Sequence, residues 1–244
     1  MTDRGRAALR QSRDALQVGP SRMAWQNGTL VIDVNEISAL PMISRVRGQI
    51  RLTPKAVTEV EACLTPDAGH IWRPFAPSAL IEVDLTQGHS WTGHGYFDAN
   101  FGNAALEADF RRWSWGRFPR ANGGTTCFYD GIRADGSTLA LGLDVAADGA
   151  VEVTEPPPLT PLKRTAWGIS RNTRCDAGAA PRQTMALLEA PFYSRCLVQT
   201  QIDGEAVEGV HETLDLIRFR SPLIKPMLAV RVPRRAGWVN GDVA

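Results

Sequence analysis

Apolar and polar residues alternate in short runs along most of the chain, and each run is closed by turn-forming residues. The clearest runs are LVIDV after Asn27-Gly28, IRLT before Pro54, ALIEVDL before Gln87-Gly88, and LALGLDVAADGAVEV around Asp148-Gly149. Alternation with a period of two fits strands with one buried face, and Asn-Gly and Asp-Gly pairs favour tight hairpin turns. We therefore expect antiparallel strands joined by short turns.

Helical periodicity is scarce, and a proline-rich run divides the chain. The best segments with a 3.6-residue apolar period are residues 3–16 and 181–188, both brief. The run EPPPLTP at residues 155–161 cannot lie in a central strand, because proline has no amide donor. Alternation resumes after it in RTAWGISR, FYSRCLVQTQI, AVEGVHETLDLIRF and LAVRVP. These patterns predict an all-β protein, a sandwich or a barrel, with an N-terminal domain at 1–154, a linker at 155–161 and a smaller domain at 162–244.

Composition and charge narrow the class of protein. The 27 Lys and Arg residues balance 26 Asp and Glu residues, so a net charge of +1 gives no bulk field to attract nucleic acid. Four scattered cysteines (Cys63, Cys127, Cys175 and Cys196) form no C-x-x-C pair, and the start MTDRGRAALRQS has no apolar signal region. We expect reduced thiols in a cytoplasmic protein. No stretch approaches the roughly 20 apolar residues needed to span a bilayer, so any membrane contact is expected to be peripheral.

The C-terminal segment SPLIKPMLAVRVPRRAG mixes apolar residues with Lys225, Arg231, Arg234 and Arg235. Such a mixture suits an anionic membrane surface. A last core strand with solvated arginines explains the same pattern, and the segment alone does not decide between the two.

Residues 70–118 carry the densest concentration of chemically useful side chains. The segment contains four of the seven tryptophans and three of the four histidines. Because successive strand side chains point to opposite faces, His70 and Trp72 share one face of a strand, and Tyr96, Asp98 and Asn100 share one face of a later strand. We expect the two faces to converge in one cavity, which places the chemistry between His70 and Arg117.

Asp98 is the strongest candidate for an acid. Its neighbours Tyr96, Phe97 and Phe101 predict poor solvation, and a poorly solvated carboxyl group has a raised pKa and can donate a proton near neutral pH. The alternative is a structural Asp that accepts hydrogen bonds from turn amides.

The other candidate residues have less support, and the sequence motifs of several enzyme classes are missing. His70 fits a buried core histidine as well as a catalyst. His89 and His94 have no third ligand, so no metal is expected. Trp113 and Trp115 suit core packing, although such rings also stabilise cations. There is no G-x-S-x-G elbow, no phosphate-binding G-x-x-x-x-G-K-[ST] loop and no convincing G-x-G-x-x-G before a helix, which disfavours serine-hydrolase and nucleotide-dependent chemistry.

A long pattern resembles one enzyme family. H-x-W followed by W-x-G-x-G-Y-x-D-x-N-x-G-x-x-x-L-E-x-D-F-x-x-W-x-W-x-R is similar to the acyclic carotenoid 1,2-hydratases, also called hydroxyneurosporene synthases. The likeness extends to MTDRGRAALRQS, RTAWGISRNTRCDAGAAPR, FYSRC and VHETLDLIRFRSP. It implies two lipocalin-like (calycin) β-barrel-type domains. Family members carry a further N-terminal section, so we expect an early strand or two to be absent here.

The resemblance also implies a reaction and its residues. The reaction is addition of water across the terminal C1=C2 bond of neurosporene, lycopene and related acyclic carotenoids, without a cofactor, to give a tertiary 1-hydroxy product. The family's catalytic His and Trp match His70 and Trp72, and its Tyr and Asp match Tyr96 and Asp98. Asp98 would protonate C2, and Trp72 and Tyr96 would stabilise the cation at C1. His70, the Asp98 carboxylate or Tyr96 would take the proton of the water, and we favour His70.

A carotenoid substrate implies which side chains contact it and where in the cell the protein acts. The side chains expected to contact it are aromatic or polar residues of the same segment: Trp91, Phe97, Asn100, Phe101, Trp113 and Trp115. Because a carotenoid is dissolved in the bilayer, we expect peripheral docking on the inner or photosynthetic membrane of a pigmented bacterium. The sequence leaves open a non-catalytic lipocalin-like binder and a polyene cyclase or isomerase. A purely structural role would leave the cluster of His70, Trp72, Tyr96 and Asp98 unexplained.

Overall fold

The computed structural model describes residues 5–37, 44–86 and 88–224, and these residues form two compact units. Unit 1 holds the described residues of Met1–Pro54 and Ala79–Tyr96, and unit 2 holds Lys55–Ser78 and Phe97–Ile224. Two long strands, β7 (His70–Leu85) and β8 (His89–Gly102), therefore each contribute one part to unit 1 and the other part to unit 2.

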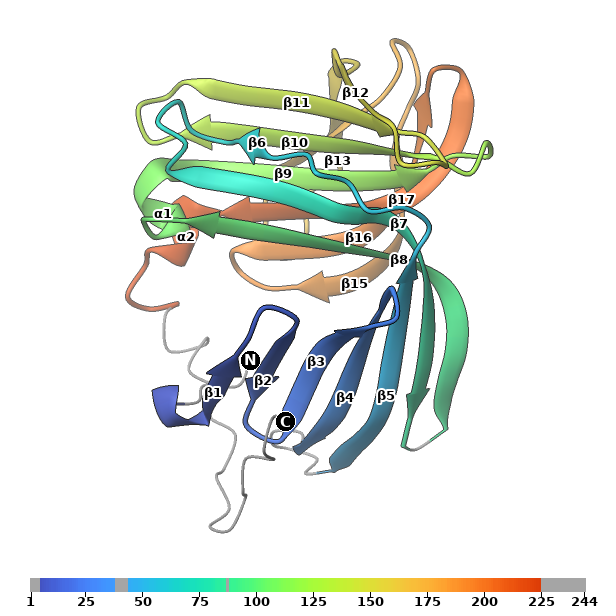
Figure 1. Cartoon of the computed structure of the whole chain (residues 1–244). Coiled ribbons are helices and arrows are strands. Elements are labelled where there is room, and N and C mark those ends of the chain that lie inside the picture. The colour runs from blue at the N-terminus through green and yellow to red at the C-terminus, as the bar shows by residue number, and fades with distance from the viewer. Residues whose placement is uncertain (1–4, 38–43, 87, 225–244) are drawn as a thin grey trace. The chain divides into compact units, whose positions relative to one another are not determined.

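Unit 1 is built on antiparallel neighbours that follow one another along the chain. After a single 3-10 turn at Arg6–Ala8 come β1 (Leu9–Gln11), β2 (Ala15–Val18), β3 (Ser21–Gln26), β4 (Thr29–Ile37) and β5 (Arg45–Pro54), drawn in blue in Figure 1. β5 then pairs with the Ala79–Leu85 part of β7. The β3–β4 turn has positive φ at Asn27 (51°) and Gly28 (78°), as the Asn-Gly pair predicts.

Unit 2 is built on a seven-stranded antiparallel sheet in the order β12-β11-β10-β9-β17-β16-β15. Its strands are β9 (Phe110–Pro119), β10 (Thr125–Arg133), β11 (Thr138–Val145), β12 (Val151–Thr154), β15 (Arg182–Glu189), β16 (Tyr193–Ile202) and β17 (Glu205–Asp215). A two-stranded sheet of β13 (Leu159–Leu162) and β14 (Arg171–Arg174), the short β6 (Ala62–Cys63) and two one-turn helices, α1 (Leu106–Asp109) and α2 (Leu216–Phe219), complete the unit.

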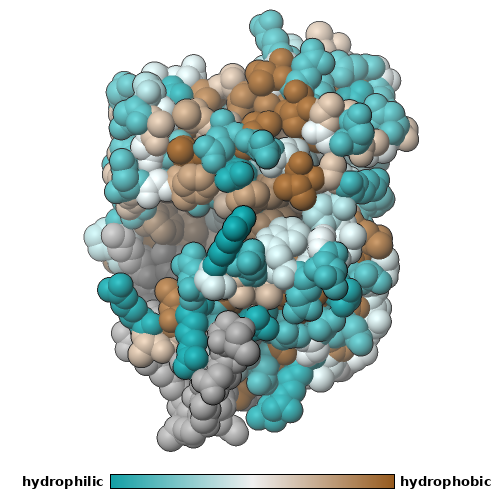
Figure 2. All heavy atoms as spheres, in the orientation of Figure 1, coloured by the Kyte–Doolittle hydropathy of each residue, from teal (hydrophilic) through white to brown (hydrophobic). Residues whose placement is uncertain are grey.

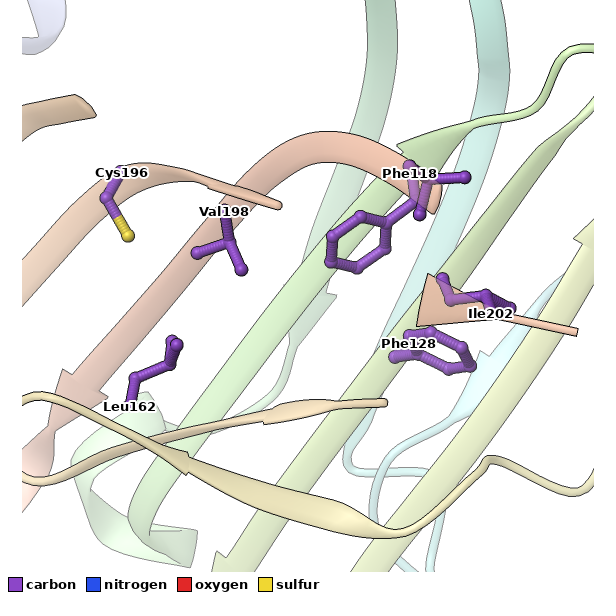
Figure 3. Packing of buried hydrophobic residues seen from close by; sticks show 7 residues of the cluster. Phe118, Phe128, Leu162, Cys196, Val198 and Ile202 are labelled. Atoms are coloured by element: carbon purple, nitrogen blue, oxygen red, sulfur yellow. The ribbon is translucent and has the colours of Figure 1, made fainter. Parts of the chain in front are cut away.

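The two faces of the seven-stranded sheet have different roles. One face packs in a hydrophobic core, where Phe118, Phe128, Val198 and Ile202 lie with Leu162 of β13 (Figure 3). The opposite face, called here the aromatic face, carries Trp113 and Trp115 of β9, Tyr129 of β10, Arg195 of β16 and Glu212 of β17, which the strand register places in neighbouring positions. The candidate site lies on the aromatic face.

The proline-rich segment does not divide the two units. Residues 155–161 lie inside unit 2, whose large sheet takes β9 to β12 from before them and β15 to β17 from after them. Proline ends a strand by removing an amide donor, and here the run leads from β12 into β13 of the small sheet. The chain thus changes sheet within one unit.

The predicted fold class and the minor share of helix are confirmed, and the two segments with a 3.6-residue apolar period do not form α-helices where the structure describes them. The sheets are antiparallel and helix is minor; among the described residues the strand pairings form open paths. Residues 5–16 form the 3-10 turn and the strands β1 and β2, and residues 182–189 form β15. The pairing of β15 with β16 shifts register between Gln183 and Met185 and again between Ala186 and Leu188. Such shifts interrupt period-two alternation and imitate a helical period.

Three further sequence predictions concern the cysteines, membrane-spanning helices and the basic C-terminal segment. All four cysteines are free thiols, as expected. In the described residues, no helix is long and apolar enough to cross a bilayer. Apolar residues gather on the surface of unit 2 over β12 and β13 (Figure 2), where Val153 and Leu159 are exposed. The basic segment with Lys225, Arg231, Arg234 and Arg235 lies outside the described residues.

Candidate functional site

β7 and β8 bring Trp72 and Asp98 into contact. Trp72 has no exposed surface, and its indole Nε1 donates a hydrogen bond of 2.9 Å to Asp98 Oδ2. Asp98 is half-buried, and burial raises the pKa of its carboxyl group above the usual value, while the Trp72 hydrogen bond and the charge of Arg195 act in the opposite direction. The raised pKa agrees with the poor solvation expected from its neighbours in the sequence.

Tyr129 occupies the middle of the aromatic face. Its ring centroid lies 5.5 Å from that of Trp72 and 5.8 Å from that of Trp113. Its hydroxyl donates to Asn100 Oδ1 at 3.4 Å. Burial raises the pKa of Tyr129 well above its usual value, so the phenol stays neutral and can act as a donor.

His70 is held between α1 and the end of β8. The ring is buried, and its Nε2 lies 2.7 Å from Asp109 Oδ2. A Cβ atom on Gly102 would lie 2.8 Å from His70 Nδ1, so the backbone of β8 closes the other side of the ring. Phe110 meets the ring edge-on at 5.5 Å between centroids. Asp109, whose side chain is 42% exposed, is therefore the partner of His70.

A second carboxyl group faces the same space. Glu212 lies opposite Trp115 on β9 and opposite Arg195 on β16 in the register of β17. Its Oε1 lies 3.3 Å from Arg195 Nε, and its side chain is 15% exposed. Burial raises the pKa of Glu212; Arg195 and a hydrogen bond from Tyr193 lower it, and the nearby charge of Asp98 raises it.

The predicted site residues are only partly brought together. Trp72, Asp98, Asn100, Trp113 and Trp115 gather around Tyr129, and a hydrogen bond from Arg117 to the carbonyl oxygen of Pro77 links β9 to the middle of β7.

Other predicted side chains lie elsewhere. Phe97 alternates with Asp98 on β8 and stacks on Phe75 at 5.5 Å. Phe101 follows the same alternation and is exposed. Trp91 and Tyr96 belong to the unit 1 part of β8; Trp91 is exposed and Tyr96 half-buried.

Sequence reasoning missed Asp109, Tyr129, Arg195 and Glu212. Within each strand, alternation assigns these side chains to faces, as in TTCFYDGIR and VHETLDL. Their convergence depends on the strand order β10-β9-β17-β16, which alternation does not reveal. In the part of the chain that the structure describes, no group of three or more His, Cys, Asp or Glu side chains is placed to hold a metal ion.

Comparison with known proteins identifies related chains. A family model described as carotenoid hydratase CrtC matches residues 1–241. An acyclic carotenoid 1,2-hydratase of Rhodobacter capsulatus is 62% identical over 243 residues, which is 99% of this chain and 86% of the relative. That of Cereibacter sphaeroides is 63% identical over 238 residues, covering 98% and 85%. That of Thiocapsa roseopersicina is 46% identical over 239 residues, covering 97% and 58%. No solved structure gives a significant match.

Proposed function

Because the chain belongs to the carotenoid hydratase CrtC family, we propose that it adds water to the terminal C1=C2 double bond of acyclic carotenoids such as neurosporene and lycopene. The product is a tertiary 1-hydroxy carotenoid, formed by a hydro-lyase in carotenoid biosynthesis. The observation that carries the proposal is the half-buried Asp98 carboxyl group, bonded to the fully buried Trp72 and facing an aromatic surface.

Asp98 is the proton donor in this reaction. Its raised pKa favours the protonated carboxyl group, which can deliver its proton to C2 of the alkene. Protonation at C2 leaves the positive charge on the more substituted C1, where water adds. The oxygen of water forms the new C1–O bond and then loses one proton, so the overall reaction consumes one water and no redox cofactor.

Aromatic rings stabilise the cation. The rings of Trp72 and Tyr129 lie 5.5 Å apart beside Asp98, and the faces of such rings attract positive charge. Trp113 and Trp115 continue this surface along β9. Tyr96 remains proposed as a further contact with the reacting end, and Trp91, Phe97, Asn100 and Phe101 as contacts with the substrate. A hydrocarbon as long as a carotenoid extends far beyond its reacting end.

His70 is proposed as a positioning residue for the reacting end. Its Nε2 bonds to Asp109, and its Nδ1 faces the backbone at Gly102. These contacts fix the ring at the start of β7, two residues before Trp72. The sequence-based assignment of His70 as the acceptor of the water proton is thus less well supported than a role in holding β7, α1 and β8 together.

A membrane surface is the proposed place of action. Acyclic carotenoids partition into the bilayer, so the protein docks peripherally on the inner or photosynthetic membrane, with the basic C-terminal segment as its contact. Flotation with anionic liposomes tests this contact: neutralising Arg231, Arg234 and Arg235 should reduce the bound fraction. Unchanged flotation would assign docking to another surface.

The reaction is tested with lycopene or neurosporene in liposomes and oxygen-18 water, followed by mass spectrometry of the products. The parent protein should form a labelled tertiary alcohol, and Asp98→Asn should form none. Unchanged substrate with both proteins would favour a non-catalytic binder. An unlabelled isomer of the substrate would favour a cyclase or isomerase.

A further inference from the structure

Hydration needs a second proton-handling group besides Asp98. When Asp98 has given its proton to C2, the water that adds to C1 must lose a proton to a base near the aromatic face. Asp109 engages Nε2 of His70, and Nδ1 is close enough to Gly102 that a Cβ atom there would lie 2.8 Å away, which leaves little room for water at the ring. Tyr129 is neutral and donates its own proton to Asn100. His70 and Tyr129 are therefore poor candidates for that base.

Glu212 has the chemistry of a base and the right neighbours. It comes from β17, between Trp115 on one neighbouring strand and Arg195 on the other. Its carboxylate contacts Arg195 Nε at 3.3 Å, and the side chain keeps 15% of its surface exposed. The direct ion pair with Arg195 favours the ionised form of Glu212, whereas the charge of Arg195 acts on Asp98 as a weaker influence than the Trp72 hydrogen bond.

We propose that Glu212, held by Arg195, accepts the proton of the water that adds to the carotenoid. This assignment rests on the hydratase reaction proposed above and adds a residue of β17 to the machinery on β7 and β8. Asp98 and Glu212 then form a pair of carboxyl groups with opposite tasks: Asp98 gives a proton to the alkene, and Glu212 accepts one from water.

The proton balance closes over one turnover. The Asp98 proton forms the new C2–H bond, water forms the C1–O bond, and the proton released by that water passes to Glu212. The proton then returns from Glu212 to Asp98 through solvent water, which restores both groups. Charge coupling favours this sequence, because the negative charge that appears on Asp98 raises the proton affinity of Glu212 when the base is needed.

A structural ion pair between β16 and β17 is the competing explanation. A cross-strand pair of this kind would stabilise the sheet and leave the chemistry to other residues. The two explanations differ in what Glu212→Gln does to the reaction. A structural role predicts loss of stability with the fate of the cation unchanged, whereas a base predicts that the cation still forms and is no longer captured by water.

The experiment follows hydration and isotope exchange in one assay, with lycopene in liposomes, D2O buffer, and the parent, Glu212→Gln, Glu208→Gln and Asp98→Asn proteins. Glu208 is exposed on the same strand and serves as the matched control. We expect Glu212→Gln to form about 100-fold less alcohol. Its recovered lycopene should contain deuterium, because Asp98 still delivers a deuteron to C2 and the uncaptured cation returns to alkene by losing a proton. Asp98→Asn should give neither alcohol nor deuterium, and Glu208→Gln should resemble the parent.

The outcomes separate this proposal from the hydratase proposal. No alcohol from the parent would overturn the hydratase reaction itself. Alcohol formation by Glu212→Gln at the level of Glu208→Gln, or loss of alcohol without deuterium in the recovered lycopene, would overturn the assignment of Glu212. If thermal melting shows that Glu212→Gln is unfolded, Glu212→Asp replaces it: the shorter carboxylate should retain part of the hydration activity, and hydration equal to that of the parent would count against a base at this position.

Discussion

The indole N–H of Trp72 donates to the carboxyl group of Asp98 across the neighbouring strands β7 and β8 at 2.9 Å. This bond favours the ionised carboxylate, whereas burial of Asp98 favours the protonated acid, and burial is the larger influence. Burial and the Trp72 hydrogen bond are therefore the two largest influences on the proton-donating strength of Asp98, and the charge of Arg195 is a smaller one.

Removing that hydrogen bond should shift the pH range of activity. Trp72→Phe keeps an aromatic ring and deletes the N–H, so the pKa of Asp98 should rise further and its acid form should persist to higher pH. Hydration, which requires the acid form, should then decline at higher pH than in the parent, although the maximal rate falls because the cation loses the larger indole ring. The pH dependence of initial rates measures the shift.

Trp167→Phe is the control for this prediction, because Trp167 is 52% exposed. Its pH dependence should match that of the parent. A decline of Trp72→Phe activity at the same pH as in the parent, or at lower pH, would mean that the hydrogen bond does not control the acid.

Replacing Asp98 should cost activity and increase stability. Because the pKa of Asp98 is higher in the folded than in the unfolded state, the folded state binds the extra proton, and its stability falls as pH rises from the unfolded value of 3.8 through the raised folded value. Asn cannot ionise, and its side-chain oxygen can still accept from Trp72. At neutral pH, Asp98→Asn should therefore be inactive and unfold at a higher urea concentration than the parent.

The same comparison at low pH is the internal control. Near pH 3, where Asp98 is protonated in both states, the stability difference between Asp98→Asn and the parent should be smaller. A variant that is less stable than the parent at neutral pH would contradict the assigned direction of the pKa shift.

The sequence predicted local strand geometry better than it predicted the site. The Asn27-Gly28 turn and the strands on either side follow from residue type and alternation alone. Alternation also assigns Trp72 and Asp98 to faces of their strands, but their contact depends on the pairing of β7 with β8. The apolar period of β15 resembles that of a helix because its register shifts disrupt the alternation. Glu212 and Arg195 were missed because β17 pairs with β9, and strand order is a property of the tertiary fold.

A small residue is required where β8 ends against β7. A Cβ atom at Gly102 would lie 2.4 Å from the carbonyl oxygen of Gly69 and 2.8 Å from His70 Nδ1, closer than real contacts allow. Gly102→Ala should therefore separate the strands, displace His70 from Asp109 and destabilise the protein by about 2 kcal/mol. Gly93→Ala is the control on the same strand, because its Cβ would meet Trp91 at an ordinary 3.5 Å. Urea unfolding measures both, and equal stability of the two variants would contradict the contact.

His211 should govern part of the stability of the protein in acid. The ring is buried, its Nε2–H donates to the carbonyl oxygen of Asn172 at 2.8 Å, and burial lowers its pKa from 6.5 to about 4. Between these two pH values His211 is protonated in the unfolded chain and neutral in the folded chain. The folded state therefore loses stability as pH falls from 6.5 towards 4. A shift of this size corresponds to a loss of roughly 3 kcal/mol.

His211→Gln should remove that part of the acid sensitivity. Gln keeps a donor for the Asn172 carbonyl and does not titrate, so the variant should be less stable at neutral pH and should lose less stability on acidification. His94→Gln is the control, because His94 is exposed, and its acid profile should follow that of the parent. Urea unfolding at a series of pH values measures the slopes. A His211→Gln slope as steep as that of His94→Gln would show that other groups, such as paired carboxylates, cause the acid sensitivity.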